Sequence, residues 1–164
     1  MARRLVVADA SPLIGLAAAG AFDLLRRLYG QVTITVSVRD EVLAGGDRPG
    51  ARELAEAIRV GWIVVVDAPW DAGVFPDLGA GEASTICFAM SHPGPCLVLM
   101  DDLSGRAHAR AAGLALSGLA GVLIAARQHE YVDNVRALLE KLEACDFRLS
   151  REVVDTILEL VGES

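Results

Sequence analysis

Several short apolar runs in this chain stop abruptly at an acidic residue. The run at 5–8 ends at Asp9, and the run at 97–100, which contains no polar residue, ends at Asp101 and Asp102. A run of this kind is typical of a strand buried on both faces of a parallel sheet. Such runs alternate with helical segments along the chain, which predicts βαβ units. The sequence therefore predicts an α/β fold with a central, mostly parallel sheet.

Local capping signals place the helices that follow these runs. Ser11 is expected to cap the first helix, with a proline at the first helical position. Ser37 is expected to cap the helix that carries Glu41 on its first full turn, and Glu82 is expected at another helix start. The proline-bearing segment 67–78 is expected to be a loop. Strands are further expected at 32–36, 62–66 and 114–116, and helices at 12–29, from 38, at 51–60, 83–90 and 103–112, from about 118, and as a pair within about 134–162.

Four acidic positions follow a strand or open a helix in this scheme, namely Asp9, Glu41, Glu82 and the pair formed by Asp101 and Asp102. In an open parallel sheet, ligands bind in the crevice beyond the carboxyl ends of the strands. Carboxylates gathered in one crevice repel each other, so they take up protons or share a hard divalent cation. The pattern therefore predicts a Mg2+ or Mn2+ site, and such a site favours hydrolysis of phosphodiester bonds.

The same segments resemble the motifs of the PIN-domain ribonucleases, in particular a branch of small prokaryotic PIN proteins described as toxin-like. In residues 7–14, Asp9 and Ser11 stand where that family has its first aspartate and the small polar residue that follows. The second and third motifs are similar to 36–42 and 78–84, with Glu41 and Glu82 as their acids. The fourth resembles 99–107, and residues 117–123 match the glycine-bearing turn downstream of it.

This resemblance implies a three-layer α/β/α fold, a Mg2+ or Mn2+ site, single-stranded RNA as the substrate and often an antitoxin partner. The leading hypothesis is a metal-dependent endoribonuclease, with the toxin of a toxin–antitoxin pair as one of its forms. Its metal ligands and water-positioning groups would be Asp9, Glu41, Glu82 and Asp101, with Asp102 as a rival or helper of Asp101. Ser11 would hydrogen-bond a carboxylate or the water.

Each acid also has a purely structural interpretation. Asp9 could merely end a strand, Asp40 belongs to a capping box, and Glu41 suits the positive end of a helix dipole. Asp102 could be the N-cap of the helix that begins at 103. Together, however, four acidic positions in this order favour the metal site over any one of these single explanations.

The charge balance works against binding to a polyanion, because the net charge is −7 and affinity for nucleic acid normally comes from basic side chains. All but one of the 15 basic residues are arginine, the side chain best suited to bidentate phosphate contacts. Arg39, Arg106 and Arg110 flank the acidic motifs and are the candidates for RNA contacts. Alternatively, they are surface arginines paired with nearby acids.

Size and composition favour one domain over residues 1–164, with the helical pair at about 134–162 as its end. A hydrophobic share of 53% suggests that a second copy or a partner covers some apolar surface, so a homodimer is expected. The last helix carries an apolar stripe that is either core or a docking face. The first residues do not form a signal-peptide core and no run is long enough to span a bilayer, so a cytoplasmic location without membrane contact is expected.

Two hypotheses from other classes compete with the ribonuclease. The first keeps the fold but treats the chain as a catalytically silent module that binds RNA or protein, as its acidity and apolar excess suggest. The second is a receiver-like domain that presents an aspartate for phosphorylation. The sequence lacks the early paired acids and the downstream lysine expected of such a domain, so phosphoryl labelling should fail.

Overall fold

The computed structural model describes residues 4–164, and its centre is a five-stranded sheet with the strand order β3-β2-β1-β4-β5. All four strand pairings are parallel, which confirms the predicted parallel sheet. Each strand is short, and all but β5 contain at least two valine, leucine or isoleucine residues, as expected for strands between helical layers. The strands are β1 (Leu5–Ala8), β2 (Val32–Thr35), β3 (Ile63–Val66), β4 (Cys96–Leu99) and β5 (Ala115–Ser117).

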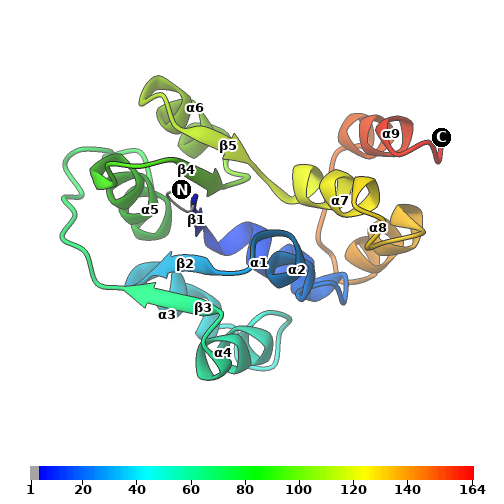
Figure 1. The fold of residues 1–164 in the computed structure, drawn as a ribbon, viewed down its shortest axis with the longest axis horizontal. Helices are drawn as coiled ribbons and strands as arrows, with labels where there is room; N and C mark the ends of the chain where they lie inside the picture. The colour runs from blue at the N-terminus through cyan, green and yellow to red at the C-terminus, as the bar shows by residue number, and fades with distance from the viewer. Residues whose placement is uncertain (1–3) are drawn as a thin grey trace.

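Residues 4–164 contain nine helices, most of which pack on this sheet, whereas α8 and α9 pack on α1 and α7. They are α1 (Ala10–Ala18), α2 (Leu24–Tyr29), α3 (Val36–Leu43), α4 (Ala51–Val60), α5 (Ala80–Ser91), α6 (Leu103–Ala111), α7 (Leu119–Gln128), α8 (Val135–Ala144) and α9 (Arg151–Leu160). In Figure 1, α5 and α6 lie on one side of the sheet, and α1, α2 and α7 lie on the other. The predicted three-layer α/β/α arrangement is therefore confirmed.

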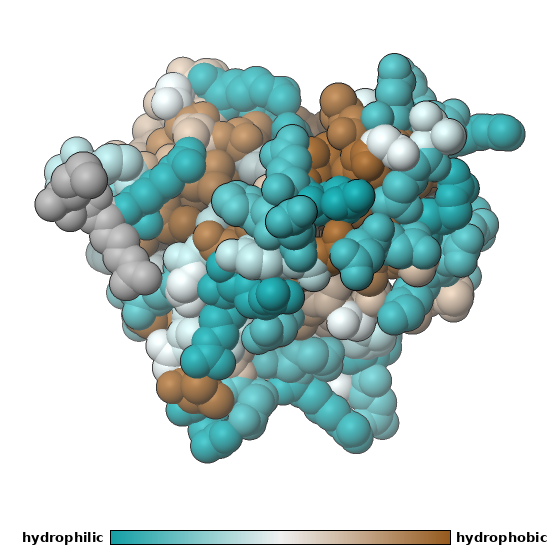
Figure 2. All heavy atoms as spheres, turned by 45° about the vertical axis from the view of Figure 1, so that its right-hand side comes forward, coloured by the Kyte–Doolittle hydropathy of each residue, from teal (hydrophilic) through white to brown (hydrophobic). Residues whose placement is uncertain are grey.

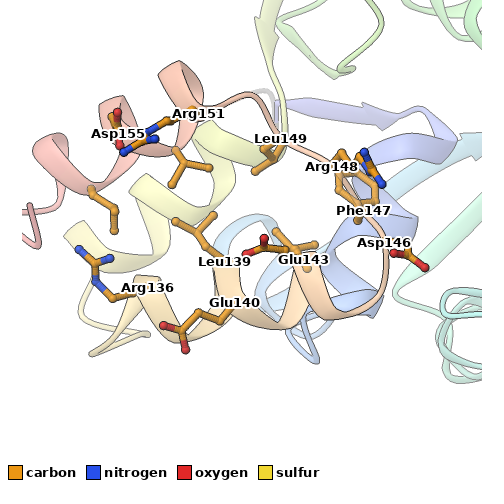
Figure 3. Close-up of a pocket in the computed structure, with 13 residues that line it drawn as sticks. Arg136, Leu139, Glu140, Glu143, Asp146, Phe147, Arg148, Leu149, Arg151 and Asp155 are labelled. Atoms are coloured by element: carbon orange, nitrogen blue, oxygen red, sulfur yellow. The ribbon is translucent and has the colours of Figure 1, made fainter.

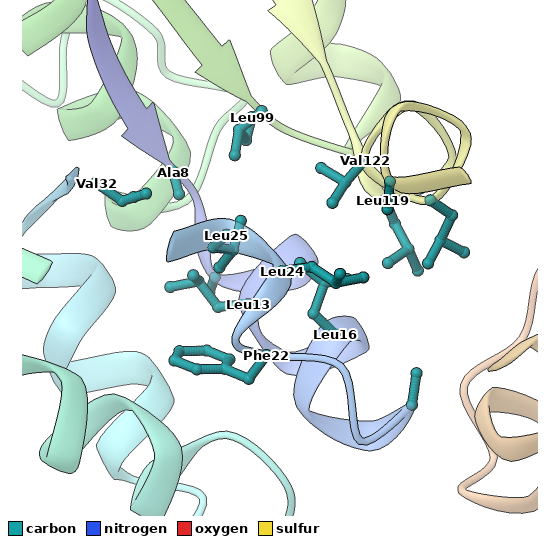
Figure 4. Close-up of a cluster of buried hydrophobic side chains, with 14 of the residues drawn as sticks. Ala8, Leu13, Leu16, Phe22, Leu24, Leu25, Val32, Leu99, Leu119 and Val122 are labelled. Atoms are coloured by element: carbon teal, nitrogen blue, oxygen red, sulfur yellow. The ribbon is translucent and has the colours of Figure 1, made fainter. Parts of the chain in front are cut away.

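Alternating side chains of the strands divide the core into two clusters. In β4, Leu97 and Leu99 face the larger cluster, which is formed with α1, α2 and α7 and is drawn in Figure 4. Val98 faces a smaller cluster formed with α5 and α6. Because side chains of a strand point alternately to its two faces, a strand apolar at every position needs a helical layer on each side. This pattern explains why the 97–100 run contains no polar residue.

Two helix starts differ from the sequence-based expectation. The first helix begins two residues earlier than expected, with Asp9 as its N-cap residue, so Ser11 lies inside its first turn. The helix after β2 is capped by Thr35, whose hydroxyl accepts a hydrogen bond from the Val38 amide at 3.3 Å. The prediction of Ser37 as the cap is wrong, because β2 ends at Thr35 and α3 begins at once. Glu41 consequently lies on the second turn of α3 and not on its first.

Other predicted elements agree with the structure, with one interruption. The segment expected as a single helix over 12–29 is divided into α1 and α2 near Gly20, whose φ of +69° ends α1. The loop predicted at 67–78 has no helix or strand, and α5 follows it. Asp102 caps α6 and Ser150 caps α9, each through a side-chain hydrogen bond to a backbone amide.

The order of the strands determines where on the sheet a ligand is expected to bind. β1 lies in the middle of the sheet, with β2 on one side and β4 on the other. The chain adds strands in one direction from β1 to β3 and in the other from β4 to β5, so the topological switch point lies between β1 and β4. Ligands bind at such points, beyond the carboxyl ends of the strands. Asp9 and Asp101 follow the two strands that flank this position.

The two C-terminal helices form a groove on one side of the molecule. A hollow of about 860 Å³ lies between α8 and α9, and Figure 3 shows Leu139 and Leu149 among the side chains that line it. On the apolar stripe of α9, Ile157 is buried whereas Val153 is 38% exposed. Figure 2 shows apolar side chains among hydrophilic ones on this side of the molecule. In the part of the chain described, no helix combines the length and the hydropathy needed to cross a bilayer.

Candidate acidic site

Two of the four acidic motifs meet above Gly81, in the first turn of α5. A Cβ added at Gly81 would lie 3.2 Å from Oδ1 of Asp9 and 3.8 Å from Oε2 of Glu41. The absence of a side chain at this position therefore leaves the space between the two carboxylates free. Glu82, the next residue, belongs to the same helical turn. Asp9, Glu41 and Glu82 are thus brought together from the end of β1, the second turn of α3 and the first turn of α5.

Asp9 is the most strongly perturbed acid of this group. Its side chain is only 2% exposed, and Oδ1 is a buried oxygen without a hydrogen-bond partner. Burial, helped by the nearby charges of Glu82, Glu41 and Asp102, raises its pKa to about 7, although a hydrogen bond from the Ala10 amide opposes the shift. A buried carboxylate with a free oxygen is costly unless it is protonated or binds a cation.

Glu41 and Glu82 approach Asp9 from neighbouring helices. The pKa of Glu41 is raised by partial burial and then by the charge of Glu82. Oε2 of Glu82 lies 2.7 Å from the point where a Cβ on Gly79 would be, so its side chain folds back over the start of its own helix. A helix N-terminus stabilises a carboxylate placed there. The prediction that Glu82 opens a helix is confirmed.

Asp101 lies in a different environment from these three acids. Its Oδ1 accepts a hydrogen bond from the backbone amide of Leu119, at the start of α7, at 3.0 Å. Its pKa is raised by burial, and the Leu119 hydrogen bond and the Arg106 charge oppose the rise. Its second oxygen, Oδ2, is buried without a partner. Asp101 is therefore held by α7 and α6 and leaves one oxygen free.

Asp102 has both a structural and an electrostatic role. Its Oδ2 accepts a hydrogen bond from the Gly105 amide at 2.8 Å, which confirms the capping interpretation. Its charge is also among the causes that raise the pKa of Asp9, whereas Asp101 is not among them. Of the two neighbours, Asp102 therefore acts electrostatically on Asp9. The order in which the sequence ranks them as metal ligands, Asp101 before Asp102, stays a prediction.

The remaining predicted site residues are less closely tied to the acids. Ser11 is half-buried in the first turn of α1, and no hydrogen bond joins its hydroxyl to a carboxylate within residues 4–164. Arg39 pairs with the neighbouring Asp40 at 3.0 Å. Arg106 donates to the carbonyl of Met100 at 2.8 Å, and Arg110 is exposed on α6. Their role in RNA binding stays a prediction.

The acids have the chemistry that a hard cation requires, but their oxygens do not surround a common point. As placed in residues 4–164, no three His, Cys, Asp or Glu side chains are close enough to enclose a metal ion. Two buried oxygens, Oδ1 of Asp9 and Oδ2 of Asp101, nevertheless have no donor. Carboxylate oxygens are the ligands that Mg2+ and Mn2+ prefer.

Sequence reasoning missed a pair of buried hydroxyls beneath these acids. Oγ1 of Thr35 and Oγ of Ser84 lie 2.8 Å apart and join the start of α3 to α5. Both side chains are buried, at 4% and 2% exposure. Thr35 could have been singled out as a capping residue at the end of an apolar run. No pattern in the sequence indicates its contact with Ser84, which lies 49 positions away.

Comparison with known proteins agrees with this architecture. The family model of the PIN domain matches residues 5–163 of the chain. A search of the curated proteins finds no match. The matched range runs from the first strand past the last helix, so it contains all of the acids described above.

Proposed function

Because the chain belongs to the PIN-domain family, whose fold is of the nuclease type, we propose that it is a Mg2+- or Mn2+-dependent endoribonuclease that hydrolyses phosphodiester bonds of single-stranded RNA. The observation that carries the proposal is the Asp9 carboxylate. It is buried, one oxygen has no partner, and the charges of Glu41, Glu82 and Asp102 all act on it. A cation removes the electrostatic cost of placing these groups together.

In the proposed site, Asp9, Glu41 and Glu82 hold the cation together with Asp101 or Asp102. When bound, a divalent cation lowers the pKa of water and balances charge on phosphodiester oxygens. Asp9, with a pKa of about 7 in the free protein, exchanges its proton for the cation near neutral pH. A carboxylate that releases its proton in this way can then accept a hydrogen bond from water.

The surrounding residues orient these acids. The Leu119 amide and the Arg106 guanidinium keep Asp101 beside the start of α7. The Gly105 amide fixes one oxygen of Asp102 and leaves the other available. Ser11, which lies two residues after Asp9 at the sheet edge, is proposed to hydrogen-bond a carboxylate or water. Asp101 and Asp102 are thus held by backbone amides before RNA arrives, which limits the reorganisation that the reaction requires.

RNA contacts and protein partners complete the proposal. Arg39 and Arg110 are proposed to contact phosphates, whereas Arg106 is engaged by the Met100 carbonyl and is better suited to hold Asp101. A homodimer, or an antitoxin in the case of a toxin, is proposed to cover apolar surface. Support comes from Val153 and Leu160 on α9, which are 38% and 62% exposed.

Two observations favour a second candidate, a catalytically silent module that binds RNA or protein. In the described part of the chain the acids do not enclose an ion as they stand, and Glu82 is folded back over its own helix. If the acids take up protons and bind no cation, the chain has the fold of a nuclease but does not hydrolyse RNA.

Thermal melting of the native chain and of Asp9→Asn, each with and without Mn2+, distinguishes the two candidate functions. We expect Mn2+ to raise the Tm of the native chain, because a ligand that binds the folded state stabilises that state. The Tm of Asp9→Asn should not change on addition of Mn2+. Glu152→Gln, at an exposed acid on α9, is the control and should respond as the native chain does. Cleavage of a single-stranded RNA should follow the same pattern. No shift in the native chain would favour the silent module.

A further inference from the structure

Four groups form a buried hydrogen-bond chain between the two helices that carry Glu41 and Glu82. The Val38 amide donates to Oγ1 of Thr35 at 3.3 Å, and this hydroxyl lies 2.8 Å from Oγ of Ser84. Ser84 in turn donates to the carbonyl of Gly81 at 3.1 Å. Each hydroxyl has a single hydrogen. Because that of Ser84 points to Gly81, Thr35 must supply the hydrogen between the two hydroxyls, which gives the whole chain one direction.

The two ends of this chain lie close to the acidic residues. Thr35 is the N-cap of α3, and Glu41 follows six positions later on that helix. Gly81 is the residue above which the carboxylates of Asp9 and Glu41 meet, and Glu82 is the next residue along α5. The chain therefore ties the backbone of one glutamate-bearing helix to the backbone of the other, directly below the acids. Helices α3 and α5 also pack against each other, and Figure 1 shows them near the same edge of the sheet.

A tie at this position opposes the mutual repulsion of the acids. The charge of Glu82 raises the pKa of Glu41, and both charges raise the pKa of Asp9. Separation of α3 from α5 would relieve this repulsion but would also widen the space available to a cation. Hydrogen bonds between buried hydroxyls resist such a movement, because breaking them leaves polar atoms without partners.

We infer that Thr35 and Ser84 are positioning residues of the acidic site, which hold Glu41 and Glu82 at the separation that a divalent cation requires. The inference rests on the proposed function. Thr35 and Ser84 do not touch the cation or RNA and act only through the glutamates. Residues that orient metal ligands in this way commonly change metal affinity by about 10- to 100-fold when they are removed.

The same helical turn provides a matched control. Oγ1 of Thr85 also donates to the Gly81 carbonyl, at 2.7 Å, and its side chain is fully buried, with 0% exposure. The hydrogen bond of Thr85 stays within α5, and no hydrogen bond of its hydroxyl reaches α3 in the described residues. Thr85→Val therefore removes a buried hydroxyl and a bond to the same carbonyl, but it leaves the tie between the helices intact.

The test is calorimetric titration of Mn2+ into the full chain. We expect Ser84→Ala and Thr35→Val to bind Mn2+ about 10- to 100-fold more weakly than the native chain. Thr85→Val should keep the native affinity for Mn2+ even if its Tm falls as far as the Tm of Ser84→Ala or Thr35→Val. Thr35→Ser, which retains the hydroxyl, should also keep the native affinity. If the chain cleaves RNA, kcat should fall in the first two variants while KM stays the same, because the RNA contacts are untouched.

Other outcomes separate this inference from the proposed function. Native Mn2+ affinity in Ser84→Ala and Thr35→Val would overturn the positioning role and leave the metal site standing. An equal loss of Mn2+ affinity in Thr85→Val would overturn the positioning role too, because the loss of any buried hydroxyl in this region would then weaken Mn2+ binding. If both variants fail to fold while Thr85→Val folds, the tie serves the fold and not the site. Absence of Mn2+ binding in the native chain would overturn the proposed function and this inference with it.

Discussion

Replacement of Asp9 by asparagine should make the protein more stable at alkaline pH when no metal is present. Burial holds the pKa of Asp9 at about 7 in the folded chain, compared with 3.8 for an unperturbed aspartate. One pKa unit corresponds to about 1.4 kcal/mol, so ionising this buried group costs the folded state on the order of 4 kcal/mol. Asparagine has nearly the same shape and carries no charge to desolvate.

The sign of the pH dependence follows from the folded state's higher proton affinity. Between the unfolded pKa of 3.8 and the folded pKa of about 7, the folded chain holds a proton that the unfolded chain has lost. The stabilising contribution of protonated Asp9 is therefore complete below the lower value and declines as the pH rises through this window. It is fully lost above the upper value, and the Asp9→Asn variant should show no such decline from this position.

Urea unfolding in the presence of a chelator measures this difference. The free energy of unfolding of Asp9→Asn should exceed that of the native chain by about 4 kcal/mol at most at pH 8, and the two should converge toward pH 4. Asp47→Asn is the control, because Asp47 lies on the surface and its replacement should change little. Parallel curves for the native chain and Asp9→Asn between pH 4 and pH 8 would refute the reasoning, because burial would then not control the ionisation of Asp9.

Four further substitutions test the packing, two at glycines beside the acids and two at leucines that compare core with surface. Gly81→Ala should raise the helix propensity of α5. It should nevertheless weaken Mn2+ binding in a titration, because the new methyl group enters the space between the carboxylates. An unchanged affinity for Mn2+ would show that the cation does not use this space. Gly118→Ala should lower the Tm by the equivalent of about 1–3 kcal/mol, because its Cβ would collide with Oδ1 of Asp101, and a Tm equal to that of the native chain would contradict the placement of that carboxylate. Leu99→Ala should cost about 2–5 kcal/mol in urea unfolding, since Leu99 is fully buried. Leu103→Ala, at a side chain 84% exposed, should stay within about 0.5 kcal/mol of the native value, and similar losses in the two leucine variants would contradict the assigned core.

Features set by local chemistry could be predicted from the sequence. The wholly apolar run before Asp101 required a strand with a helical layer on each face, and β4 has both. The capping role of Asp102 and the position of Glu82 at a helix start depend only on neighbouring residues, and both agree with the structure. The family resemblance, drawn from four short motifs, is confirmed by the match over residues 5–163.

Features decided by distant contacts could not be predicted in this way. Thr35 and Ser37 are both good capping residues, and the choice depends on where β2 stops. The pairing of Thr35 with Val66 on β3 extends the strand to that residue, so the cap falls there. Asp101 and Asp102 differ in role because α7 offers a backbone amide to the first and α6 to the second. The contact of Asp102 is local and could be predicted, whereas no pattern near Asp101 indicates its contact with Leu119, 18 positions away.

The position of β1 in the middle of the sheet has a consequence for the order of folding. β1 is the first strand of the chain, yet one of its neighbours is β4, and Leu5 pairs with Cys96. The amide that holds Asp101 belongs to Leu119, which lies still later in the chain. Contacts between residues so far apart in sequence form slowly, and during synthesis they must wait for the later segment. An incomplete nascent chain can therefore carry Asp9 and Glu41 without the groups that complete the acidic site, which is assembled only after most of the protein has been made.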